Sequence, residues 1–178
     1  MKAPRIHAIP LLSLAVALFA LPVVWGAAEV NSARVSVVFV EPENFRDFRD
    51  GPFQTEQIVS HLSDEFTAHV VKLAKQYLTA EQHLEVRFTD IDLAGDFEPW
   101  QGAGLQDVRI VRDIYSPRME LEFRLLDASG AVVKEGQRTL RDLGFLWTAS
   151  SLNRSDALKH DKTLLTDWFR NEFRVAKN

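Results

Sequence analysis

The chain has 178 residues, no cysteine and a formal net charge of −4. The lack of cysteine excludes disulfides, thiolate metal sites, cysteine nucleophiles and a lipid-modified cysteine. The acidic balance argues against non-specific nucleic-acid binding, because that binding needs a basic surface to release counterions from phosphate. A hydrophobic fraction of 46% is typical of a globular protein and too high for a disordered chain.

Residues 1–28 have the pattern of a cleavable secretory signal peptide. Lys2 and Arg5 give a positive start, an apolar segment covers residues 11–21, and small side chains precede a cleavage point after Ala28. We therefore expect a periplasmic or secreted protein with no membrane span after cleavage. The alternative is a retained anchor, since an apolar stretch of 18 residues is just long enough to span a bilayer.

The remaining residues, 29–178, have the length of a single domain with one core. Removing Lys2 and Arg5 changes the formal net charge from −4 to −6. A net charge of this sign and size suits a soluble protein.

The first predicted elements are a strand, a helix and a second strand. Residues 34–40 are β-branched and apolar on both faces, which predicts a central strand. Residues 55–78 carry apolar side chains at three- and four-residue steps, which predicts a helix with Asp50 or Thr55 as its N-cap. Residues 84–93 are predicted to form the next strand.

Three strands and a helix are predicted in the rest of the chain. Residues 107–115 are expected to form a strand, and residues 118–126 alternate strictly between apolar and charged side chains, as in a sheet with one solvated face. Residues 131–140 return as the hairpin partner of that strand. A last helix is expected over residues 155–173, with Ser155 as its N-cap.

The predicted element order is β-α-β-β-β-β-α. Runs of strands flanked by helices indicate the α+β class. We expect two layers, with a mainly antiparallel sheet of about five strands and two helices packed on one of its faces.

The strand over residues 84–93 contains an irregularity. Apolar side chains occupy even positions up to Phe88 and odd positions from Ile91, and a regular strand cannot keep both sets on one face. A β-bulge near Thr89-Asp90 would restore the phase, and the alternative is that the strand leaves the sheet there. Bulges often reorient side chains near functional sites. Asp90 and Asp92 therefore become candidate site residues.

The acidic and histidine-containing segments do not predict a metal site. Asp90, Asp92 and the acids that follow them could bind a hard cation, but their spacing departs from a calcium loop and favours a solvated turn. His61 and His69 lie eight residues apart on the first predicted helix without an H-E-x-x-H motif, and His69 lies close to the buried stripe. We therefore predict no metal and no cofactor.

Arginines are frequent on the predicted sheet. They could bind an anionic group of the cell envelope, or they could pair with acids on neighbouring strands, which the negative net charge favours. These arginines are Arg109, Arg112, Arg118, Arg124, Arg138 and Arg141.

Several segments resemble the domain-of-unknown-function family 3016, a group of exported proteobacterial proteins. They are Phe88-Thr-Asp-Ile-Asp-Leu-Ala-Gly95, Glu98-Pro-Trp100 and Arg109-Ile-Val-Arg-Asp-Ile-Tyr-Ser-Pro-Arg118. The strand end Val37-Val-Phe-Val-Glu-Pro42 and the segment Asp167-Trp-Phe-Arg170 are also similar. The resemblance covers nearly all of the predicted mature chain. It implies an exported protein and supplies no activity, so no functional residue follows from it.

The sequence favours a non-enzymatic periplasmic binding or accessory domain that engages a partner protein or an anionic envelope component. One alternative is a metal-dependent or hydrolytic enzyme that uses Asp90 and Asp92 with a histidine. Another is a structural or stress-related protein without a small ligand. The candidate binding residues are Asp90, Asp92, Trp100, Arg112, Tyr115 and Arg118.

Overall fold

The computed structural model describes residues 30–32, 34–51, 53–102, 104–147 and 155–174. The predicted leader, residues 1–28, lies outside the described residues. Within these described ranges, no helix is long and apolar enough to cross a membrane.

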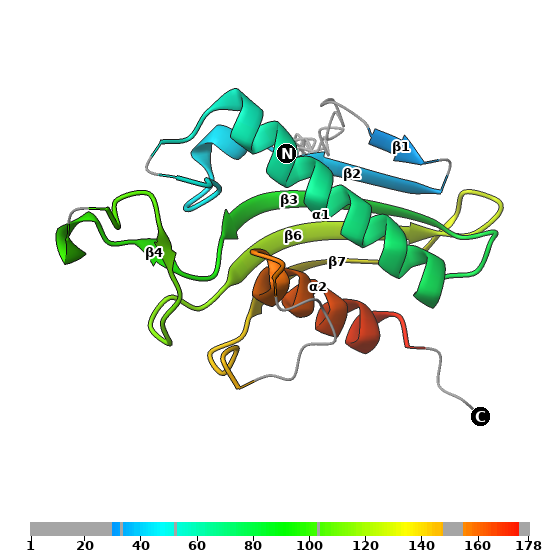
Figure 1. Cartoon of the computed structure of the whole chain (residues 1–178). Helices are drawn as coiled ribbons and strands as arrows, with labels where there is room; N and C mark the ends of the chain where they lie inside the picture. The colour runs from blue at the N-terminus through cyan, green and yellow to red at the C-terminus, as the bar shows by residue number, and fades with distance from the viewer. Residues whose placement is uncertain (1–29, 33, 52, 103, 148–154, 175–178) are drawn as a thin grey trace, which may run out of the picture.

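A five-stranded sheet forms one layer and two helices form the other (Figure 1). The strands lie in the spatial order β1 (Val30–Ser32), β2 (Val35–Phe39), β3 (His83–Asp92), β6 (Arg118–Leu126) and β7 (Val132–Arg141). The helices are α1 (Glu56–Tyr77) and α2 (Lys159–Glu172). Neighbouring strands are antiparallel except β2 and β3, a parallel pair that α1 connects. The predicted two-layer α+β class, with both helices on one face, is confirmed.

The patterns that predicted the longer elements correspond to buried faces. Thr55 caps α1, and its side-chain hydroxyl accepts a hydrogen bond of 3.3 Å from the backbone N–H of Ile58. The apolar stripe of α1 packs against the alternate apolar side chains of β3 and β6 in a single core. Its most deeply buried members include Phe66, Phe88 and Phe123.

The predicted strand over residues 107–115 is wrong. Only β5 (Arg109–Ile110) forms, and it pairs with β4 (Asp96–Phe97) in a separate two-stranded sheet. Val108, Val111 and Ile114 are exposed, so the apolar residues of this segment face no layer that would bury them. Strand propensity depends on such packing. The fifth strand of the main sheet is β1, which we did not predict.

The last helix begins at Lys159, so the predicted N-cap at Ser155 is also wrong. Asp156 accepts a hydrogen bond of 2.9 Å from the backbone N–H of Leu158, and its other carboxylate oxygen lies 2.8 Å from the Lys162 ammonium group. This local side-chain to backbone bond competes with helix formation and delays the start of α2.

Residues 96–102 and 104–117 extend beyond the end of the main sheet, and we call them the lobe (Figure 1). They contain β4, the 3-10 helix η2 (Pro99–Gln101) and β5. Gly95 directly precedes the lobe with φ +85°, and a Cβ atom at this position would lie 2.9 Å from the carbonyl oxygen of Ile110. The backbone of Gly95 therefore lies close to that of Ile110, and this contact holds the lobe beside the end of β3.

Candidate functional site

The β-bulge predicted in β3 is present. Phe88 pairs with Leu121 and Asp90 pairs with Glu120, so Thr89 is the extra residue. The bulge keeps Ile91 in the core while it turns the neighbouring aspartates to the opposite face.

Asp90 and Arg118 form one ion-pair network at the end of the sheet. Asp90 accepts hydrogen bonds of 2.9 Å from the Arg118 guanidinium group and 2.9 Å from the backbone N–H of Arg46. Arg118 also pairs with Glu120. These two predicted site residues therefore come together, and each is neutralised by the other.

Asp92 lies beside this network with looser contacts. Its nearest ion-pair partner is the Arg46 guanidinium group, at 3.8 Å. The chain around Asp47 runs alongside Asp92 in a parallel bridge. Burial raises the pKa of the Asp92 carboxyl, and the charge of Asp47 raises it further.

A second arginine network, centred on Asp47, was not predicted. The Arg109 guanidinium group donates to Asp47 Oδ2 at 2.6 Å and to the carbonyl oxygens of Gly95 and Arg49, at 2.9 and 2.6 Å. The Phe97 ring lies 4.7 Å from the Arg109 guanidinium carbon and 5.2 Å from that of Arg49. The mostly charged residues 46–50 contain no strand or helix pattern, and by composition they indicate only a polar loop. The signal available was a run of alternating charge around two phenylalanines three residues apart, Phe45 and Phe48, both of which are buried.

The remaining predicted residues belong to the lobe. The side chain of Glu98 is 2% exposed, and it accepts a hydrogen bond of 2.8 Å from the Tyr115 hydroxyl group and lies 3.0 Å from the Arg112 guanidinium group. This hydrogen bond to Glu98 raises the pKa of Tyr115. Trp100 is 71% exposed and lies outside both networks. The six predicted residues therefore divide between the sheet end and the lobe.

A cavity of about 290 Å³ opens between the sheet end and the lobe, and we call it the charged cavity. Its volume is near the lower limit of small-molecule sites, roughly 300 Å³. Its charged and polar lining residues are Arg46, Asp47, Arg49, Asp92, Asp96, Tyr115, Ser116 and Arg141. Of the six predicted residues, Asp92 and Tyr115 are part of this lining.

Among the described residues, Arg46, Arg141 and Asp92 of the charged cavity have no partner of opposite charge closer than 3.8 Å. The guanidinium group of Arg46 approaches Asp90 and Asp92 only to 3.8 Å. Arg141 donates from Nε to the hydroxyl oxygen of Ser116 at 3.1 Å, which orients the guanidinium group, and its two terminal nitrogens bind no other described residue. The cavity therefore offers a ligand the N–H donors of the two arginines and the carboxylate of Asp92 as an acceptor.

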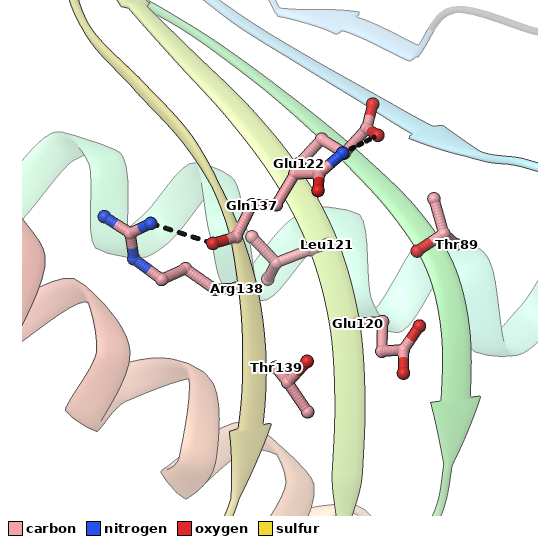
Figure 2. A pocket seen from close by; sticks show the side chains of 7 residues that line it. All are labelled: Thr89, Glu120, Leu121, Glu122, Gln137, Arg138 and Thr139. Atoms are coloured by element: carbon pink, nitrogen blue, oxygen red, sulfur yellow. Dashed lines mark hydrogen bonds between the residues drawn. The ribbon is translucent and has the colours of Figure 1, made fainter.

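Two other cavities have charged groups that are more fully paired. A hollow of about 230 Å³ on the helix-free face lies beside Thr89, where Gln137 donates to Glu122 at 2.8 Å (Figure 2). A cleft of about 350 Å³ has an apolar floor that includes Leu62, Leu93 and Leu158. Two of the acids on its rim are both bound to the Lys162 ammonium group, and Arg109 is bound to Asp47.

The histidines do not join the aspartates in the charged cavity. No histidine is among the described residues that line it. His69 is buried between α1 and α2, with Nε2 2.9 Å from the carbonyl oxygen of Lys162, as expected for a core histidine. In the described part of the chain, no group of three or more His, Asp or Glu side chains could hold a metal ion.

The family model for proteins of unknown function DUF3016 matches residues 33–171. The chain belongs to this family. The match includes both arginine networks and the whole lobe, so the resemblance seen in the sequence is confirmed over these segments. Comparison with curated proteins and with solved structures finds no match.

Proposed function

We propose that this member of the DUF3016 family is an exported, non-enzymatic binding domain whose charged cavity takes up a small solute, or an exposed part of an envelope component, that carries an anionic group. The observation that carries the proposal is the pair of guanidinium groups of Arg46 and Arg141 in one cavity. In the part of the chain that the structure describes, neither is held by a carboxylate closer than 3.8 Å. Arginine is well suited to recognise carboxylate or phosphate, because its planar fork donates two parallel hydrogen bonds.

The export part of the proposal rests on residues 1–28. The positive start, the apolar segment and the small residues before position 29 have the order that signal peptidase reads. Expression of the whole chain followed by intact-mass measurement tests this part. A mature chain that begins at Glu29 supports export with cleavage, whereas an N-terminus at Met1 contradicts it.

The binding part is tested by thermal unfolding of the purified protein with a panel of small carboxylates, phosphates and amino acids. A ligand that binds only the native state raises the unfolding midpoint by mass action. We expect at least one compound with an anionic group to raise the midpoint of the wild type, and we expect this shift to be lost in the double variant Arg46→Gln/Arg141→Gln.

Arg170→Gln is the matched control, because Arg170 lies on α2 with its side chain 51% exposed and, among the described residues, pairs only with Asp167. This variant should keep the shift. A panel in which no compound raises the midpoint, or a shift that persists in the double variant, contradicts the proposed site.

A further inference from the structure

Four charged residues form a row across the end of the sheet. The pairing register places Asp47 beside Asp92, Asp92 beside Arg118, and Arg118 beside Arg141. Directly opposite residues on neighbouring strands project from the same face of a sheet. The row therefore runs from two acids to two arginines, so its ends have opposite charge.

Two members of this row have strong partners already. Asp47 is held by Arg109 at 2.6 Å and by Arg49 at 2.9 Å. Arg118 is held by Asp90 at 2.9 Å. Asp92 and Arg141 are the members left with spare hydrogen-bonding capacity, and both line the charged cavity.

The spare groups are complementary in sign and in hydrogen-bonding role. Arg141, with Arg46 beside the cavity, offers N–H donors to an anion, and Asp92 offers carboxylate oxygens to a cation. A ligand that was only an anion would lie near the carboxylate of Asp92 and be repelled by it. A ligand that was only a cation would be repelled by the two guanidinium groups.

On the basis of the proposed function, we infer that the ligand of the charged cavity is a small zwitterion of the amino-acid type. Its carboxylate lies against the guanidinium groups of Arg141 and Arg46, and its ammonium group lies against the carboxylate of Asp92. Both charges of the ligand then meet an opposite charge that the protein itself leaves without a close partner.

The test compares compounds that differ only in charged groups. The purified protein is titrated by calorimetry with L-alanine and L-leucine, with their amine-free analogues propionate and 4-methylpentanoate, and with their carboxylate-free analogues ethylamine and 3-methylbutylamine. We expect at least one amino acid to bind about tenfold or more tightly than both of its analogues, since each analogue loses one charge-assisted contact.

Two variants test the contacts of the ligand's ammonium group and of its carboxylate separately. Asp92→Asn should weaken amino-acid binding about tenfold or more and leave the affinity for the amine-free analogue equal or higher. Arg141→Gln should weaken binding of both compounds. Asp167→Asn on α2 is the matched control and should change neither, and equal unfolding midpoints show that the variants are folded.

The outcomes distinguish the inference from the proposed function. If propionate or 4-methylpentanoate binds as tightly as its amino acid, the zwitterion inference is overturned, while anion binding in the cavity stands. If none of the compounds binds, and phosphate also fails to bind, both are overturned. If an amino acid binds but Asp92→Asn does not weaken it, the assigned orientation is wrong.

Discussion

The guanidinium group of Arg109 donates a hydrogen bond of 2.6 Å to the carboxylate of Asp47, across 62 residues of sequence. Asp47 lies in the segment between β2 and α1, and Arg109 lies in the lobe. The side chains are 9% and 16% exposed, so the pair is largely shielded from water. This contact joins the lobe to the segment that bridges to Asp92 at the end of β3, beside the charged cavity.

Arg109→Met should destabilise the protein by about 3 kcal/mol, because it leaves the carboxylate of Asp47 buried without its closest partner. The double variant Asp47→Asn/Arg109→Met should recover part of this loss. Urea unfolding of the two single variants and the double variant measures the coupling free energy. Additive losses would show that the pair is not coupled, and Arg170→Met serves as an exposed control.

Gly95→Ala should also destabilise the protein, by roughly 1–3 kcal/mol. The residue has φ +85°, which side chains disfavour, and the new Cβ atom would lie 2.9 Å from the carbonyl oxygen of Ile110. Hydrogen exchange should increase most in the lobe. Gly130→Ala is the control for backbone strain alone, since φ is +82° there and no described residue other than its chain neighbours lies within 4 Å of the new Cβ. Equal losses in both variants would rule out the steric contribution.

Asp161 should make the protein less stable as the pH rises from about 4 to about 7. Burial raises the pKa of this carboxyl from 3.8 to about 7, so the folded state binds a proton that the unfolded state releases across this window. Asp161→Asn keeps an oxygen for the backbone N–H of Ala94, which donates to Oδ1 at 3.0 Å, but cannot titrate. The unfolding free energy of the variant minus that of the wild type should therefore increase as the pH rises. A difference that stays constant with pH would contradict this.

His69 should have the opposite effect. Burial lowers its pKa from 6.5 to about 4, so the unfolded state binds the extra proton and stability is lost as the pH falls from about 6.5 to about 4. His69→Gln retains a donor for the carbonyl oxygen of Lys162 and removes this titration. Denaturant midpoints measured from pH 4 to pH 7 should fall less on acidification in the variant. An unchanged slope would show that His69 does not titrate as its burial implies.

The sequence was most informative where one local pattern decides one structural property. The switch from even to odd apolar positions predicted the bulge at Thr89, and the stripe after Thr55 predicted α1, because both depend on which side chains can share a buried face. Residues 107–115 had strand-like composition as well. No partner strand lies beside most of that segment, which local composition does not reveal.

The lining of the charged cavity was predicted only in part, for a related reason. Asp92, which the bulge marked, and Tyr115 are the two candidate residues that line it. Arg46 and Arg141 gained importance only from what surrounds them in space. An arginine that lacks a close carboxylate cannot be told from a paired one in a single sequence, because its partners are fixed by the tertiary fold.

The single extra residue at position 89 also bears on how such a chain tolerates changes of length. Without Thr89, the alternation before and after it would join into one regular strand, and the same apolar residues would still face the core. Deletion of this one residue is therefore compatible with an intact core. It would alter the local twist of β3 and so the direction of Asp90 and Asp92. A chain of this fold that lacked the residue would keep the scaffold and differ in the direction of the two aspartates at the end of the sheet.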